Sequence, residues 1–332
     1  MEFFPKTKSN LPLVSIIIPC RNEEKYIKRC LESIIINNYP KEKLEVIVVD
    51  GMSEDKTREI IKEYSKRYLF IKIIENPKKF TPFGLNIGIK ESKGEIIVRM
   101  DAHAVYEENY IFKCLKYFEE YKADNVGGVI RTLSSKNNLW AKAIAIVLSH
   151  PFGAGSSSFR VGSPKPKWVD TVFGGCYKKE VFKKIGFFNE RLIRSQDIEF
   201  NQRLRKSGGK ILLVPDIKVY YCPQSTFKDF LKHNFNDGVW TVYPLKFGIK
   251  IFSWRHLIPL FFVLGLIILS EISFSLFLFV IFFYFLASIF FSFFVAIKEK
   301  NPGLLIVLPI VFANRHFGYG FGSIWGLIKT MI

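Results

Sequence analysis

A buried strand that ends in charged side chains is encoded by residues 95–104, EIIVRMDAHA. Three β-branched apolar residues open it, as in a strand covered on both faces. Asp101 and His103 follow at its end, with one alanine between them. Residues two apart in an extended backbone share a face, so both side chains can reach one ligand. Carboxylate plus imidazole suits Mn²⁺ better than Ca²⁺, and Mg²⁺ also fits where phosphates supply further ligands. For His103 alone, a structural hydrogen bond to a backbone carbonyl is the alternative.

The first hundred residues alternate between apolar runs and amphipathic segments. Strands are predicted at residues 14–18, 44–49, 70–74 and 96–100, and helices at 24–36, 56–68 and 82–91. This alternation predicts an α/β fold with a mostly parallel sheet covered on both faces. Ser53 is the predicted N-cap of the second helix.

Polar residues gather where the predicted strands end. Residues 19–23, PCRNE, follow the first strand, Asp50 and Gly51 follow the second, and the pair at 101 and 103 follows the fourth. Ligands of such sheets bind beyond the carboxyl ends of the strands, so a site is expected at this edge. No GxGxxG motif follows the first strand, which disfavours a dehydrogenase.

The middle of the chain is less regular. We expect a helix at residues 139–148 followed by a mobile loop, and then a strand, a turn at Gly174-Gly175 and a helix. Residues 195–209, SQDIEFNQRLRKSGG, predict an amphipathic helix that ends at its glycine pair. Residues 226–240 predict a basic, interfacial amphipathic helix.

The last quarter of the chain is apolar enough for membrane helices. Between residues 257 and 297 the only formally charged residue is Glu271, and we predict spans near 257–271 and 275–297. A third apolar segment, 303–328, is interrupted by Arg315 and His316, which would be costly at mid-bilayer. It is either a third span or an in-plane segment near the head groups, and we favour the second.

The net charge of +18 fits attraction to an anionic membrane surface, although a solvated Lys-rich surface is an alternative. Basic residues flank the predicted hairpin on both sides, which predicts that both flanks face the cytoplasm. They are Lys228, Lys232, Lys246, Lys250 and Arg255 before it, and Lys298 and Lys300 after it. Residues 1–10 do not resemble a signal peptide, and the five cysteines form no CxxC, as expected of a cytoplasmic catalytic domain. No zinc-finger spacing or RNP-like motif is present, so no nucleic-acid partner is expected.

Four motifs in order resemble family 2 glycosyltransferases. They are VSIIIPCRNEEKYIKRCLESI, EVIVVDGMSEDKT, NIGIKESKGEIIVRMDAHA and FGGCYKKEVFKKIGFFNERLIRSQDIEFNQRLRKSGGKILLVPD, within residues 12–225. DGMS, DAHA and the C-terminal HFGYGFGSIWGL resemble the succinoglycan-type exopolysaccharide transferases, which carry C-terminal membrane helices. The resemblance implies the GT-A fold, the nucleotide-diphospho-sugar transferase fold with a mostly parallel mixed sheet.

The resemblance also implies residue roles. The implied donor-binding residues are Pro19, Arg21, Glu23, Asp50, Asn86 and Asp101. Asp101 and His103 fall on the DxD motif, which binds the donor diphosphate through a divalent metal, here Mn²⁺ or Mg²⁺. Asp197 falls on the general base, for which plain helix N-capping is the alternative. Gly174 and Gly175 match the turn beside the acceptor, and Glu199 is a lesser candidate for acceptor contact.

Three positions depart from the family pattern. Gly51 stands where a second acid is common after the second strand, His103 stands for the second acid of the DxD motif, and Gln196 stands for the usual Glu before the base. These departures concern the nucleobase contact, the metal preference and the charge beside the base.

We therefore expect a multi-pass protein of the cytoplasmic membrane, with a cytosolic GT-A domain at residues 1–225, an interfacial segment at 226–256 and a membrane region at 257–332. It would transfer a sugar with inversion from a UDP-sugar to a hydroxyl of a lipid-linked or growing polysaccharide acceptor, in contact with membrane lipids. The alternatives are a polyprenyl-phosphate sugar transferase, which needs no base, and a non-catalytic partner in polysaccharide assembly.

Overall fold

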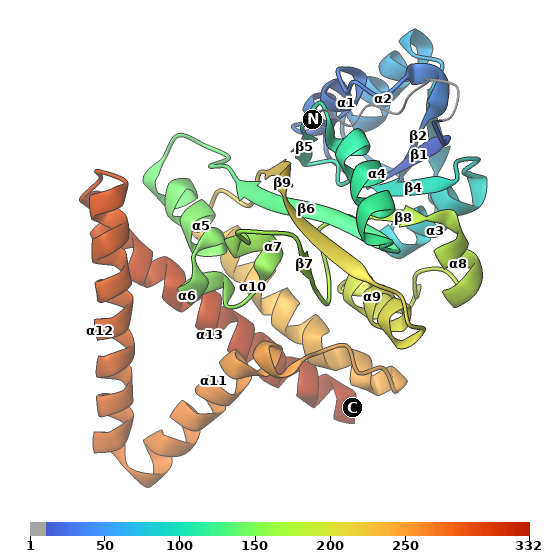
Figure 1. Ribbon diagram of the computed structural model, residues 1–332. Helices are drawn as coiled ribbons and strands as arrows, with labels where there is room; N and C mark the ends of the chain where they lie inside the picture. The colour runs from blue at the N-terminus through green and yellow to red at the C-terminus, as the bar shows by residue number, and fades with distance from the viewer. Residues whose placement is uncertain (1–10) are drawn as a thin grey trace. The chain divides into compact units, whose positions relative to one another are not determined.

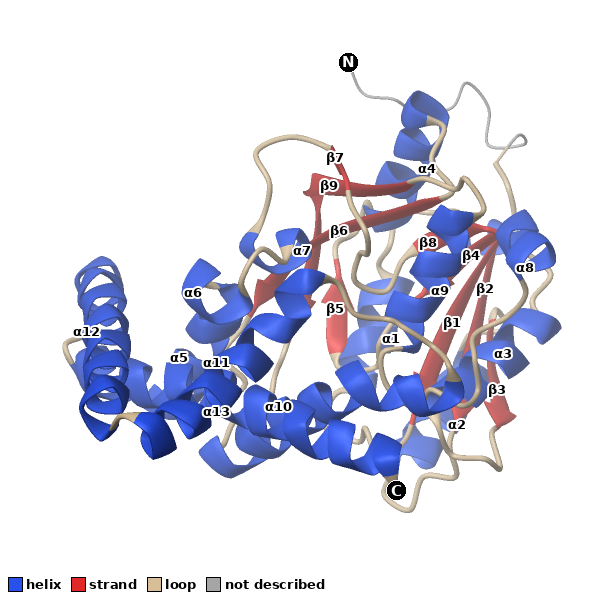
Figure 2. Ribbon diagram, turned by 90° about the horizontal axis from the view of Figure 1, so that it is seen from below, coloured by secondary structure: helices blue, strands red, loops and turns tan. Residues whose placement is uncertain are grey.

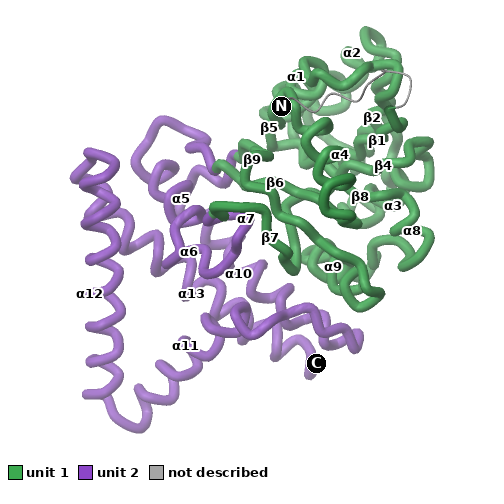
Figure 3. The backbone as a smooth tube through the Cα atoms, viewed as in Figure 1, with its two compact units in different colours: residues 1–131, 162–221 green, residues 132–161, 222–332 purple. Residues whose placement is uncertain are grey.

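The computed structural model describes residues 11–332, so the expectation about a signal peptide at residues 1–10 lies outside the described part. Two compact units make up the chain (Figure 3). The first contains the residues up to Arg131 together with Gly162–Tyr221, and the second contains Thr132–Val161 and Cys222–Ile332. Residues 132–161, which we had assigned to the catalytic domain, thus belong to the second unit. The predicted boundaries at 225 and 256 stay predictions.

A mixed sheet forms the first unit, in the order β3-β2-β1-β4-β8-β6-β9-β5, with β7 paired to β9. Its parallel part is the predicted one, with Val14 of β1 beside Leu44 of β2 and Ile96 of β4. The elements of this part are β1 (Val14–Cys20), α1 (Ile27–Ile35), β2 (Leu44–Asp50), α2 (Thr57–Arg67), β3 (Ile71–Glu75), α3 (Thr81–Glu91) and β4 (Ile96–Arg99).

The remaining strands of the first unit that the ladders describe run antiparallel to their partners. With their helices they are β5 (Ala104–Tyr106), α4 (Tyr110–Tyr121), β6 (Asn125–Thr132), β7 (Lys167–Trp168), β8 (Cys176–Lys178), α8 (Lys179–Ile185), α9 (Gln196–Lys206) and β9 (Ile211–Tyr221). One prediction was wrong, because the strand beside Gly174-Gly175 follows the turn instead of preceding it. Strand β6 was not predicted, since Gly127 and Gly128 interrupt its apolar pattern.

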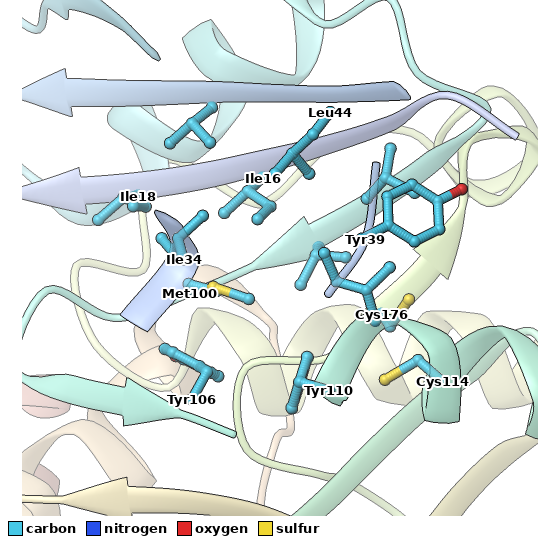
Figure 4. Close-up of a cluster of buried hydrophobic side chains, with 14 of the residues drawn as sticks. Ile16, Ile18, Ile34, Tyr39, Leu44, Met100, Tyr106, Tyr110, Cys114 and Cys176 are labelled. Atoms are coloured by element: carbon cyan, nitrogen blue, oxygen red, sulfur yellow. The ribbon is translucent and has the colours of Figure 1, made fainter. Parts of the chain in front are cut away.

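The core of the first unit lies between β1 and the helices that cover it. Ile16 and Ile18 on β1 join Ile34 of α1 and Met100 in one buried cluster (Figure 4). At the amino end of β2 a buried carboxylate, that of Glu45, accepts hydrogen bonds from Ser15 Oγ (2.7 Å), Lys72 Nζ (2.9 Å) and the backbone N–H of Lys93 (2.9 Å). Burial alone would raise the pKa of Glu45, but the bonds from Lys93, Lys72 and Ser15 outweigh it and lower that pKa.

Helices make up the second unit (Figures 1 and 2). They are α5 (Leu139–Ser149), α6 (Pro151–Ala154), α7 (Ser158–Val161), α10 (Phe227–Val242), the short 3₁₀ helix η3 (Tyr243–Phe247), α11 (Trp254–Ile272), α12 (Phe274–Lys298) and α13 (Gly303–Met331). By length and composition, three helices within residues 11–332 could cross a membrane, namely α11, α12 and α13. The most apolar windows of α11 and α12 are only 17% buried, whereas that of α13 is 56% buried. The protein thus covers α13 far more than the other two.

Helix α13 packs closely against α10 because glycines remove the side chains between them. A Cβ added to Gly322 would lie 2.0 Å from the backbone oxygen of Phe235, and one added to Gly238 would lie 2.0 Å from that of Tyr319. Real Cβ atoms do not approach so closely, so these positions require glycine. The interhelical contact therefore depends on backbone proximity.

Arg315 and His316, the two residues predicted to interrupt the apolar segment of α13, both have partners. Arg315 Nη1 donates to Asn234 Oδ1 (2.6 Å) and lies 3.5 Å from Asp237 Oδ2. His316 Nε2 lies 2.8 Å from the carbonyl oxygen of Phe152, and its Nδ1 lies 2.9 Å from the hydroxyl of Tyr284. A carbonyl can only accept, so Nε2 carries the proton and Nδ1 accepts from the tyrosine. Arg315 and His316 therefore both find polar partners within the protein. The topology of α13 stays a prediction.

Candidate active site

The loops after β1 and β2 interlock at the carboxyl ends of the parallel strands. The backbone N–H of Asn22 donates to Ser53 Oγ (2.9 Å), and Asn22 Oδ1 accepts from the N–H of Glu54 (2.9 Å). The N–H of Glu23 donates to Thr57 Oγ1 (2.7 Å). Asn22 is one of few non-glycine residues with a positive φ, at 55°. These bonds join two predicted donor loops into one rigid edge.

Asp50 is entirely buried under this edge. Its carboxylate accepts from the N–H of Ser53 (3.1 Å) and from Ser53 Oγ (2.5 Å), and Arg58 Nε lies 3.3 Å away. The predicted N-cap role of Ser53 was wrong, because α2 begins at Thr57 and the Ser53 hydroxyl is already used by Asp50. Asp50 has no exposed atom, and its contact with a nucleoside stays a prediction.

The missing second acid at Gly51 has a steric cause. A Cβ there would lie 2.9 Å from the backbone oxygen of Lys79, 3.2 Å from Arg21 Cβ and 3.3 Å from the backbone oxygen of Cys20. The chain after β3 thus occupies the space that an aspartate at position 51 would need.

Glu23 holds the imidazole of His103. Glu23 Oε1 lies 3.0 Å from His103 Nδ1, and the ring of Tyr221 makes an edge contact with the imidazole, 5.3 Å between centroids. Burial alone would lower the pKa of His103, but the hydrogen bond to Glu23 and the charges of Glu23 and Asp101 outweigh it and raise that pKa. A carboxylate on one ring nitrogen is the usual support of a metal-binding histidine, and Nε2 would be the ligand atom. Pro19 lies half-buried in β1, and Arg21 is exposed, 3.5 Å from Glu54.

Arg99 brings Asp101 and Asp197 together. Its side chain is buried at the end of β4, with Nη2 3.2 Å from Asp101 Oδ1 and Nη1 3.8 Å from Asp197 Oδ2. Burial alone would lower the pKa of Arg99, but the two carboxylates outweigh it and raise that pKa. The N-cap of α9 is Ser195, so Asp197, in the first turn, does not serve as the cap. The predicted metal ligand and the predicted base therefore share one guanidinium.

The glycine turn is bound to the same strand end. The N–H of Arg99 donates to the carbonyl oxygen of Gly175 (2.9 Å). Gly174 has a φ of +65°, and a Cβ there would lie 2.7 Å from the backbone oxygen of Arg99. Both the conformation and the close approach require glycine at 174. The turn predicted to lie beside the acceptor is thus fixed next to Arg99.

Two predicted site residues are engaged elsewhere. Asn86 is buried. Its side-chain amide nitrogen donates to the carbonyl oxygen of Phe188 and to Glu190, and its side-chain oxygen accepts from the N–H of Phe188. Both oxygens of Glu199 bond to Arg203, at 2.5 and 2.9 Å. Their direct contacts with donor and acceptor stay predictions, whereas their observed bonds hold the segments around 188 and 203.

Sequence reasoning missed Arg99. The signal was available, because a charged residue within the apolar run IIVRM is expected to be buried, and a buried charge needs a partner. Its contact with Asp101, two residues on, and its three tertiary neighbours became evident only in the structure: Asp197, Gly174 and Gly175.

Within the described residues, no group of three or more His, Cys, Asp and Glu could hold a metal by itself. The backbone from Asp101 to Ala104 is a turn, in which the N–H of Ala104 donates to the carbonyl oxygen of Asp101 (3.1 Å), so the predicted extended backbone at Asp101 and His103 was wrong. The two side chains would still supply one oxygen and one nitrogen ligand to a shared site. Mn²⁺ accepts such a mixed set, and a bound diphosphate would supply further oxygens. The residues present thus fit a metal held jointly with a substrate.

Comparisons with known proteins show the family of this chain. The family model for Glycosyl transferase family 2 matches residues 15–186, more than half of the chain. The chain is 33% identical over 324 residues to the dolichyl N-acetyl-alpha-D-glucosaminyl phosphate 3-beta-D-2,3-diacetamido-2,3-dideoxy-beta-D-glucuronosyltransferase of Methanococcus voltae, covering 95% of this chain and 97% of the relative. It is 26% identical to the succinoglycan biosynthesis protein ExoA of Rhizobium meliloti, covering 74% of this chain and 80% of that protein.

A solved structure shares the fold. The mannosyltransferase PcManGT from Pyrobaculum calidifontis, in complex with GDP-Man and Mn²⁺, superposes with a TM-score of 0.63 at 16% identity, covering 96% of this chain and 88% of that one. This likeness confirms the predicted GT-A fold with C-terminal apolar helices. The family match and the relative from Methanococcus voltae lead to one conclusion: the chain belongs to glycosyltransferase family 2.

Proposed function

We propose that this glycosyltransferase moves a sugar from a UDP-sugar to a hydroxyl of a lipid-linked or growing polysaccharide acceptor, with inversion at the transferred carbon. The observation that carries the proposal is the shared guanidinium of Arg99, which holds the predicted base Asp197 and the predicted metal ligand Asp101 at one place. A base and a leaving-group site must both lie near the reacting carbon, and these two carboxylates meet that need.

Each residue has a role in the proposed displacement. Asp197 takes the proton of the acceptor hydroxyl as its oxygen bonds to the sugar carbon. The bond from that carbon to the donor diphosphate breaks, and the diphosphate leaves with the electron pair. A divalent metal held by Asp101 and His103, Mn²⁺ or Mg²⁺, would neutralise the charge on the diphosphate. The proposed donor-binding segment, the end of β1 and the loop after it, contains Pro19, Arg21 and Glu23. The Mn²⁺ in the PcManGT structure supports the metal.

The acceptor class follows from the relatives and from the apolar helices. One relative is named for action on a dolichyl N-acetylglucosaminyl phosphate and another for succinoglycan biosynthesis. We infer that α11 and α12 cross the cytoplasmic membrane, because their apolar side chains are exposed and basic residues flank the hairpin. The catalytic domain would then face the cytoplasm, where nucleotide sugars are made. Labelling of single cysteines placed before α11 and after α12 from each side of the membrane tests this topology.

Transfer assays test the chemistry. UDP-, GDP- and dTDP-sugars are first compared by the thermal stabilisation they give to the purified protein with Mn²⁺. Removal of the metal, and Asp101→Ala, are each expected to lower the transfer rate by about 100-fold or more. Asp197→Asn is expected to lower it by about 100- to 10,000-fold, since the other carboxylate that contacts Arg99, that of Asp101, is assigned to the metal and not to the base role. The matched control is Asp124→Asn, because the carboxylate of Asp124 accepts from the backbone N–H of Lys210 on the surface and, within the described residues, forms no ion pair with Arg99.

The outcomes separate the alternatives. Indifference to metal and to Asp101→Ala would refute the metal assignment. An active Asp197→Asn would favour transfer to a polyprenyl phosphate, whose oxygen is already ionised and needs no base. A folded protein that turns over none of the donors would favour a role as a non-catalytic assembly partner.

A further inference from the structure

A single buried guanidinium lies between the two carboxylates of the candidate site. Arg99 is 8% exposed, and each of its terminal nitrogens faces a different acid, Asp101 from Nη2 and Asp197 from Nη1. Burial of a charge is costly unless it is well paired, and a structural pair would need only one partner. The planar fork of arginine can hold two acids at a fixed separation, which a lysine cannot.

The backbone of Arg99 is fixed as firmly as its side chain. Arg99 lies in the ladder of β4, where it pairs with Ile17 of β1, and its N–H donates to Gly175. The left-handed turn at Gly174 packs on its carbonyl oxygen. The guanidinium therefore starts from a rigid strand end, as a positioning group should.

We propose that Arg99 is a positioning residue that sets the place of the base Asp197 relative to Asp101, and so to the leaving diphosphate. The inference rests on the proposed function, because it assigns Arg99 its effect through the base. Asp197 lies in the first turn of α9, after a loop, and the ion pair that the described residues give its carboxylate is the one with Arg99. Arg99 supplies that support from the sheet.

The charges also balance through the reaction. Before transfer, Arg99 offsets one of the two carboxylate charges, which lessens the repulsion between Asp101 and Asp197. When Asp197 receives the acceptor proton it loses its charge, and Arg99 keeps its own protons and its bond to Asp101. The contact of Nη1 with Asp197, at 3.8 Å, is an ion pair and not a hydrogen bond, and within the described residues Arg99 Nε and Nη1 have no hydrogen-bond partner, so donor capacity remains.

A double-mutant cycle separates positioning from a general structural effect. Transfer rates are measured under single-turnover conditions for wild type, Arg99→Gln, Asp197→Asn and the double variant. We expect Arg99→Gln alone to lower the rate by about 100-fold, as a base displaced by about 1 Å does, with the donor KM changed by less than about threefold. In the Asp197→Asn background the same change should cost less than about threefold, because the group it positions is already disabled.

Arg203→Gln is the matched control. Arg203 also pairs with a carboxylate of α9, Glu199, and bonds to the backbone oxygens of Ile185 and Phe187, but the described structure shows no contact of Arg203 with Asp101 or Asp197. Arg203→Gln should therefore lower the transfer rate by the same factor in wild type and in the Asp197→Asn background. Arg99→Lys keeps the positive charge but loses the planar guanidinium that contacts two carboxylates. It should therefore lower the transfer rate in each background as Arg99→Gln does. If Arg99→Gln does not fold, Arg99→Lys replaces it in the double-mutant cycle.

Equal losses from the Arg99 variants in both backgrounds would overturn the positioning role and leave the proposed function intact. An Asp197→Asn variant as active as wild type would instead overturn the proposed base, and the positioning role with it. A donor KM that rises while kcat is unchanged would assign Arg99 to donor binding and would also refute the inference.

Discussion

The buried amide of Asn86 offers a sharp test of how the site is built. Asn86 Nδ2 donates to the carbonyl oxygen of Phe188 (2.9 Å) and to Glu190 Oε1 (2.9 Å), and Asn86 Oδ1 accepts from the N–H of Phe188 (3.0 Å). One side chain on α3 thus satisfies both backbone groups of a buried residue 102 positions later. This favours a structural role for Asn86 over the donor contact that its motif implies.

Asn86→Ala removes all three bonds and leaves the buried N–H and C=O of Phe188 without their partner. Each buried group left unpaired costs about 1–3 kcal/mol, so a loss of about 3 kcal/mol is expected for the two. A loss of that size lowers the melting temperature of a chain of this size by about 6–12 °C. Asn86→Asp keeps the acceptor for the N–H of Phe188 but sets a carboxylate against that residue's carbonyl oxygen and against Glu190. It should therefore be less stable than Asn86→Ala at neutral pH.

Thermal unfolding of the purified chain measures both variants, and transfer assays well below the transition measure the donor KM. We expect the melting temperatures to fall in the order wild type, Asn86→Ala, Asn86→Asp, with the donor KM within about threefold of wild type. Acidification should narrow the gap between the variants, because a protonated carboxyl can donate to the oxygen of Phe188. An unchanged melting temperature with a raised donor KM would refute this reasoning and return Asn86 to the donor site.

Three further predictions concern stability. The folded-state pKa of Glu45 is lowered, so its carboxylate stabilises the fold above the unfolded-state pKa and this contribution is lost as the pH falls through the folded-state pKa. Urea unfolding should thus show Glu45→Gln less stable than wild type at neutral pH by about 1–3 kcal/mol. The difference in unfolding free energy between the two proteins should shrink as the pH falls. A difference that stays constant with pH would contradict this reasoning. Gly51→Asp should lower the melting temperature through overpacking, and a variant as stable as wild type would show that the loop moves freely. Gly322→Leu should separate α10 from α13 and lower the melting temperature, because its Cβ meets the backbone of Phe235, whereas Gly265→Leu, with open space around it, should not.

The periodic parts of the chain were predictable because their signal is local. The strands at Val14–Cys20, Leu44–Asp50 and Ile96–Arg99 are continuous apolar runs, and each was placed within about two residues. Strand β6 escaped because its two glycines face close neighbours, Val172 and Ile217, which no local pattern reveals. The helix at Leu139–Ser149 was predicted, but its membership of the second unit depends on long-range packing.

The sequence by itself determined the fold class, the edge of the sheet where the polar residues gather, and the identity of Asp101, His103 and Asp197 as candidates, because strand ends and ordered motifs can be read from neighbours along the chain. The tertiary structure decided which candidates meet. Arg99 joins Asp101 to Asp197, Glu23 holds His103, and Asn86 is turned to a distant backbone. These pairings join residues up to 102 positions apart, and their distances depend on how strands and helices pack, which no local pattern of residues records.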